Sequence, residues 1–183
     1  MNRMFGCSLI TPALAGMTFA QVNERRENQQ DRIANGVADG QLTAGETAHL
    51  ENKEKNLNHE IAGDRAANGG TLTNGEKAQV NRQQNRLSGQ IYNDKHNAAT
   101  QHYGNNEVDA RRENQQDRIA RGIRSGQLTA GQTAKLEHQE SNINHEIHND
   151  RAANGGKLTP REHAQVNRQL NRESARIYNK KHN

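Results

Sequence analysis

The apolar residues along this chain recur at the spacing of an α-helix. In residues 22–97 they form three groups, and the members of each group lie on one helical face. This spacing predicts helices over residues 22–38, 44–67 and 74–96, and the same pattern returns in residues 108–183. The first three groups are Val22, Ile33 and Val37; Leu50, Leu57 and Ile61; and Val80, Leu87 and Ile91.

The segments between the predicted helices carry capping boxes. In each box a Thr precedes Glu or Gln by three residues, so that the two side chains can satisfy free amides at the start of a helix. In the last copy Pro160 takes the first helical position, where no amide proton is needed. Glycines such as Gly40 and Gly126 stand where the preceding helices should end. The boxes begin at Thr43, Thr73, Thr129 and Thr159.

The chain contains a tandem duplication. Residues 108–183 repeat residues 22–97, and the string RRENQQDRIA stands at both 25–34 and 111–120. Because internal repeats determine architecture, we expect an all-α protein of two tandem three-helix units, arranged as antiparallel hairpins or a small bundle. The boundaries predicted are 21–97 for unit 1, 98–107 for a linker and 108–183 for unit 2.

The composition predicts a marginal core. Only 30% of the 183 residues are hydrophobic and 3% are aromatic, and the net charge is only +4 because Asn and Gln supply much of the polarity. Such a core cannot wall the deep, water-excluding pocket that a catalyst usually needs. We therefore predict that the protein is not an enzyme, with no catalytic residues and no cofactor-binding residues.

Residues 1–20 are typical of a secretory signal peptide, with Arg3, an apolar run, and the small residues Thr18 and Ala20 before the expected cleavage point. The apolar run is short for a membrane span, which needs about 20 apolar residues. Cleavage would remove Cys7, the one cysteine. We expect a secreted or periplasmic protein without a stable membrane span after cleavage.

The turn from Asp39 to Glu46 resembles the second half of an EF-hand loop, which makes these two carboxylates candidate calcium ligands. The resemblance fails at loop position 3, a ligand position that Val37 occupies here. The capping box beginning at Thr43 also accounts for Glu46 without any metal. Calcium binding at this turn therefore stays an alternative hypothesis.

Histidines offer a second candidate metal site. His145 and His148 are three residues apart on a predicted helix, so they face the same way, and His138 stands two turns earlier. These residues are candidate ligands for a divalent transition metal. The competing interpretation is that the histidines are solvated or, like His182, lie at a helix C-terminus where a cation is favoured.

The charge pattern argues against nucleic acid as the partner, although the sequence pI is 9.4. Acidic residues alternate with the arginines of the first predicted helix, and cleavage of the leader would leave no Phe or Trp to stack on bases. A mixed-charge helix is usually a solvated face. An unidentified protein or an envelope surface is the partner that this pattern favours.

The strings RIANGVADGQLTAGETAHL, DRAANGGTLTNGE and IYNDKHN resemble a group of small, uncharacterised secreted bacterial proteins with GxLTxxE turns and IYxxKHN endings. That resemblance implies no chemistry. The 16 glycines and the mean hydropathy of −1.20 are similar to those of hydrophilins, which are stress proteins. We therefore expect a non-enzymatic, stress-protective or partner-binding protein, with divalent-metal binding as the alternative.

Overall fold

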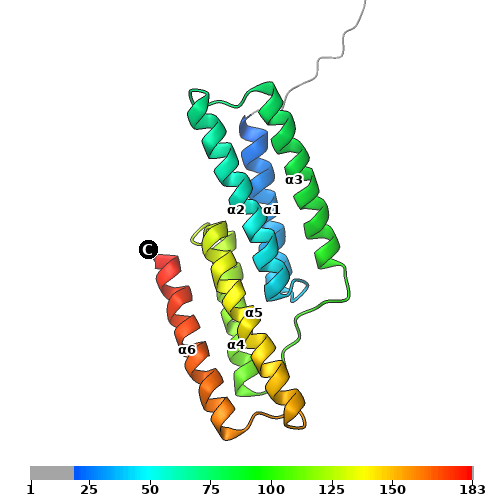
Figure 1. Cartoon of the computed structure of the whole chain (residues 1–183), viewed down its shortest axis with the longest axis vertical. Coiled ribbons are helices and arrows are strands. Elements are labelled where there is room, and N and C mark those ends of the chain that lie inside the picture. The colour runs from blue at the N-terminus through cyan, green and yellow to red at the C-terminus, as the bar shows by residue number, and fades with distance from the viewer. Residues whose placement is uncertain (1–18, 183) are drawn as a thin grey trace, which may run out of the picture.

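The computed structural model describes residues 19–182, and this range contains six helices and no strand (Figure 1). The all-α fold is confirmed, and each helix lies within three residues of the bounds expected from the sequence. The helices are α1 (Phe19–Ala38), α2 (Ala44–Ala67), α3 (Asn74–Lys95), α4 (Glu107–Arg124), α5 (Ala130–Ala153) and α6 (Pro160–His182).

Most of the predicted signal peptide, residues 1–18, lies outside the described residues. Phe19 and Ala20 belong to the first turn of α1. None of the six described helices is long and apolar enough to cross a membrane.

Each predicted capping box is present. The amide of Glu46 donates to Thr43 Oγ1 at 3.3 Å, and the Thr43 amide donates back to Glu46 Oε2 at 2.9 Å. The boxes that begin α3, α5 and α6 have the same geometry. Gly40 and Gly126, which follow α1 and α4, have φ angles of 66° and 70°, the left-handed conformation that glycine adopts without steric cost. Helix bounds are thus set by local chemistry.

The two repeats pack against each other through four helices. In Figure 1, α2 runs antiparallel to α5, and α1 runs antiparallel to α4, while α3 and α6 lie on the outside at opposite ends. The equivalent residues Asn52 and His138 meet where α2 crosses α5, with the Asn52 amide nitrogen 3.3 Å from His138 Nε2. The repeats are therefore related by an approximate twofold axis.

The largest core cluster lies on this axis and draws residues from both repeats. Smaller clusters in each repeat fill the two ends of the molecule, around Val80 and Val166. The two repeats thus share one core, and their division into separate domains stays a prediction. The central cluster comprises Ile33, Ala34, Val37, Leu42, Leu50, Leu87, Ile91, Ile119, Ala120, Ile123, Leu128, Leu136 and Ile177.

Buried amides fill the remaining contacts between helices. Gln29 of α1 donates to the Gln84 carbonyl of α3 at 2.7 Å and to Ser88 Oγ at 2.8 Å. Gln115 of the second repeat makes the equivalent bonds to α6 at the same distances. Buried amide side chains therefore join the helices by hydrogen bonds where apolar residues are few.

Candidate functional site

A groove of about 400 Å³ opens between the two repeats. Residues of α1 and α2 line one side, among them Arg26, Gln30 and Asn58, and the turn between α4 and α5 lines the other with Gly126 and Leu128. We call this hollow the open groove. It combines an apolar wall with charged and amide side chains, which is the usual composition of a binding site.

The twofold axis places an equivalent groove on the other side of the molecule, which we call the twin groove. Its lining contains Arg112, Asn144 and Gly40, the equivalents of Arg26, Asn58 and Gly126. The segment between α3 and α4, residues 96–106, runs through it.

Three contacts attach this linker to the twin groove. The Gln101 amide donates to the Gly40 carbonyl at 2.8 Å, and the Asn144 side chain donates to Gln101 Oε1 at 3.3 Å. The Arg112 guanidinium lies over the Tyr103 ring, 5.2 Å from its centre, in a cation–π contact. Burial raises the pKa of Tyr103, and the charge of Arg112 opposes this effect.

The two grooves therefore differ in what covers them. A methyl group built on Gly40 would lie 2.8 Å from the Gln101 carbonyl oxygen, whereas one built on Gly126 would have no neighbour within 4 Å. Arg112 is buried, with 6% of its surface exposed, while Arg26 is only partly buried. Similar lining residues are covered on one side of the molecule and accessible on the other.

Asp109 contacts the end of the linker, where the Asn106 side chain donates to it at 2.6 Å. This buried carboxylate accepts from Arg112 at 2.9 Å and from Arg151 at 3.1 Å, and Gly104 of the linker packs against it. Burial acts to raise the pKa of Asp109, but the bonds from Arg151 and Arg112 outweigh it and lower the pKa. The equivalent residue in the first repeat is Asn23, which carries no charge.

Each of the two grooves has buried carboxylates beside it, on α2 and on α5, close to glutamine and arginine side chains of α1 and α4. Glu51 and Glu54 of α2 are at most 1% exposed, and so are their equivalents Glu137 and Glu140. Gln30 donates to Glu51 Oε2 at 3.3 Å, while neither Glu54 oxygen has a well-aligned hydrogen bond. The contact between the repeats therefore contains buried carboxyl groups, and several of their oxygens lack a well-aligned hydrogen bond.

Burial raises the pKa of each of these carboxyl groups. The pKa of Glu51 rises to about 8 and that of Glu54 to about 7, where the charge of Arg26 opposes burial. In the second repeat the pKa of Glu140 rises to about 8, and that of Glu137 rises well above its ordinary range. Each of these groups therefore binds its proton more tightly in the folded protein than an exposed carboxyl does.

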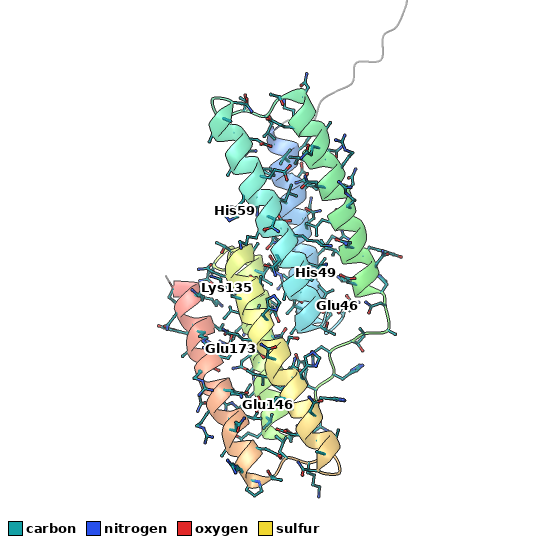
Figure 2. All side chains as sticks on the ribbon, in the orientation of Figure 1. Glu46, His49, His59, Lys135, Glu146 and Glu173 are labelled. Atoms are coloured by element: carbon teal, nitrogen blue, oxygen red, sulfur yellow. The ribbon has the colours of Figure 1, made fainter. Side chains whose placement is uncertain are left out.

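A further carboxylate of this set, Glu173, is fully buried on the side of α6 that faces α5 (Figure 2). Arg176 donates to it at 3.1 Å, although burial still raises its pKa. Gln84 and Leu87 of α3 correspond to Leu170 and Glu173 of α6, and all four side chains are buried. The exchange therefore moves the polar group by one turn within a buried face.

The structure places the two calcium candidates in one turn but gives Glu46 another role. Glu46 lies at the start of α2 (Figure 2), where its Oε2 accepts from Thr43 and its Oε1 accepts from the Asn97 side chain at 2.6 Å. Asp39 is exposed in the turn after α1. Calcium binding at this turn stays the alternative hypothesis, although these contacts already occupy both oxygens of Glu46.

The histidine candidates share one helix. His138, His145 and His148 are all exposed on α5, and His138 contacts Asn52 across the twofold axis. Among residues 19–182, no group of three or more His, Cys, Asp and Glu side chains is arranged to hold a metal ion. Transition-metal binding by these histidines has no further support from the geometry.

Sequence reasoning missed both the grooves and the carboxylates. Tyr103 gives the one available signal, because a large aromatic residue in a polar linker needs a surface to cover it. Comparison of the chain with protein-family models, with curated proteins and with solved structures finds no match.

Proposed function

We propose that this chain is a non-enzymatic binding protein of the secreted or periplasmic space, which binds a partner through the open groove. One observation carries the proposal: the chain itself occupies the twin groove, which has closely similar lining residues, with its own linker. The leader predicted for residues 1–20 supports a place of action outside the cytoplasm.

The other hollows of the described surface support the choice of this groove. A hollow of about 300 Å³ between α2 and α3, lined by Lys53 and Arg86, has a close equivalent of about 220 Å³ between α5 and α6. These two hollows are features of the repeat itself. The open groove differs from these hollows because its equivalent, the twin groove, is already occupied by the linker. Of the two grooves, only the open groove is therefore accessible to a partner.

Site-specific cross-linking tests this proposal. A photoreactive amino acid replaces Asp31, which lines the open groove, and in a matched control it replaces Arg86, which lines the hollow between α2 and α3. Each variant is irradiated with the envelope fraction and the medium of the cells that make the protein. We expect one sequenced partner peptide at position 31 and none at 86. No adduct at 31, or the same adducts at both positions, would contradict the proposal.

Stress protection, the other function expected from composition, needs no groove. If the protein acts only in that way, it should preserve a labile enzyme through drying better than an inert carrier does, and substitutions in the open groove should not alter the effect. Cross-linking at position 31 would then fail.

A further inference from the structure

The linker shows what the open groove can hold. In the twin groove an extended backbone donates one amide to a turn glycine carbonyl, an amide side chain bonds an asparagine, and a phenol ring lies on a guanidinium. The corresponding groups of the open groove are the Gly126 carbonyl, Asn58 and Arg26, and all of them line it. The same three binding groups are therefore present in both grooves, but the chain's own linker binds only those of the twin groove.

We propose, building on the function above, that the open groove binds an extended, tyrosine-bearing segment of a partner protein, in the manner of the linker in the twin groove. The tyrosine ring lies on the Arg26 guanidinium. The amide two residues before the tyrosine donates to the Gly126 carbonyl, and Asn58 bonds the side chain at that same position.

The linker of the same chain cannot be this occupant. It joins the end of α3 to the start of α4, and Gln101 and Tyr103 are already bonded in the twin groove. Asp109 and its two arginines fix its last residues beside α4, whereas Asn23 gives the first repeat no such anchor. The other two tyrosines of the chain, Tyr92 and Tyr178, lie within α3 and α6, so a second chain must supply an extended segment with a tyrosine.

The lining of the open groove explains why the segment should be polar and close to neutral. Two arginines, Arg26 and Arg124, and two acids, Glu27 and Asp31, line the groove together, so it presents no excess of either charge. Beneath them the buried Glu54 carboxyl interacts with Arg26. The linker peptide, ATQHYGNN at residues 99–106, has this neutral, amide-rich character.

Calorimetric titration with a synthetic peptide of residues 98–106 tests the proposal on the full chain. We expect one site per chain with a dissociation constant of about 1 mM or tighter. Replacing the peptide's tyrosine by alanine should weaken binding by about fivefold to thirtyfold, the factor for losing a cation–π contact, while phenylalanine should retain it. Proline at the position of Gln101 removes the donated amide and should abolish binding.

Matched variants of the protein locate the site. Arg26→Ala should weaken binding of the tyrosine peptide by the same factor, and Arg86→Ala, which removes the same charge from another hollow, should leave it unchanged. Circular dichroism verifies that both variants remain helical. If Arg26→Ala does not fold, Arg26→Gln serves instead: it keeps a long polar side chain beside Glu54 but removes the cation, and it should weaken binding of the tyrosine peptide in the same way.

The outcomes separate the two proposals. Equal affinity for the tyrosine and alanine peptides, or no binding of either, would overturn the tyrosine assignment even if cross-linking at position 31 captures a partner. If neither experiment detects a ligand, the binding function fails as well. A concentration-dependent dimer that the tyrosine peptide dissociates would assign the groove to a second copy of this chain and overturn the partner proposal.

Discussion

The free energy of unfolding should fall as the pH rises through the neutral range, and Glu51→Gln should weaken this dependence. Folding raises the pKa of Glu51 from 4.5 to about 8, chiefly by burial, so the folded state holds its proton more tightly than the unfolded state. The associated stability is fully present below about pH 4.5 and is lost as the pH rises to about 8.

The magnitude follows from the pKa change. Each pKa unit corresponds to about 1.4 kcal/mol, so ionising Glu51 in the folded protein costs roughly 5 kcal/mol. Glutamine cannot ionise, and its carbonyl can still accept from Gln30 as Glu51 Oε2 does at 3.3 Å. The variant should therefore match the parent near pH 5 and exceed its stability by several kcal/mol near pH 9.

Urea unfolding followed by circular dichroism, repeated from about pH 5 to about pH 9, measures this difference. Glu24→Gln on the exposed face of α1 removes the same charge and serves as the control, which should keep the parent's pH profile. A parent protein whose stability is constant over this range would refute the argument. So would equal slopes for the parent and Glu51→Gln.

Further substitutions and a calcium titration test the packing, the caps and the calcium hypothesis. Gly122→Ala should destabilise the protein by about 1–3 kcal/mol because the added methyl group would lie 2.6 Å from Leu128. Gly89→Ala, where the methyl group would have no neighbour within 4 Å, should instead stabilise α3 by up to about 1 kcal/mol. Urea unfolding measures both changes. Thr73→Ala should cost about 0.5–2 kcal/mol through loss of the cap of α3, measured in the same way. Calcium titration should give no heat and no change in helicity, because Glu46 already accepts from Thr43 and Asn97; heat that Glu46→Gln abolishes would contradict this.

Much of the fold could be predicted from the sequence because the signals are local. A capping box uses the backbone and side chains of four residues, so Thr43 and Glu46 determine where α2 starts whatever packs on that helix. Apolar spacing likewise identified buried positions such as Leu50 and Ile91, which are fully buried. Neither signal depends on knowing how the repeats meet.

The candidate site could not be predicted, because it depends on how the two repeats pack against each other. On a helix with one buried face, Glu51 and Glu54 would be solvated, as expected for acids beside an apolar stripe. In the structure α2 contacts α1, α3 and α5 together, and α1 supplies the neighbours of the two buried carboxyls, Gln30 beside Glu51 and Arg26 beside Glu54. The single apolar stripe read from the sequence describes only part of what α2 buries.

The asymmetry between the grooves was also beyond the sequence pattern. A duplication predicts two equal surfaces, and the strings RRENQQDRIA place Arg26 and Arg112 in identical contexts. The difference comes from the linker, which exists once, and from Asp109, which replaces Asn23 and helps to hold the linker's end. One ordered segment between two copies is sufficient to make their surfaces unequal.

Methyl NMR of the full chain with the residue 98–106 peptide shows whether the peptide enters the open groove. Leu128 lines the open groove and Leu42 is its equivalent in the other repeat, so the two methyl signals distinguish the grooves. Saturating peptide should shift the Leu128 signal and leave that of Leu42 in place. A shift at Leu42 alone, or at neither residue, would contradict the proposal.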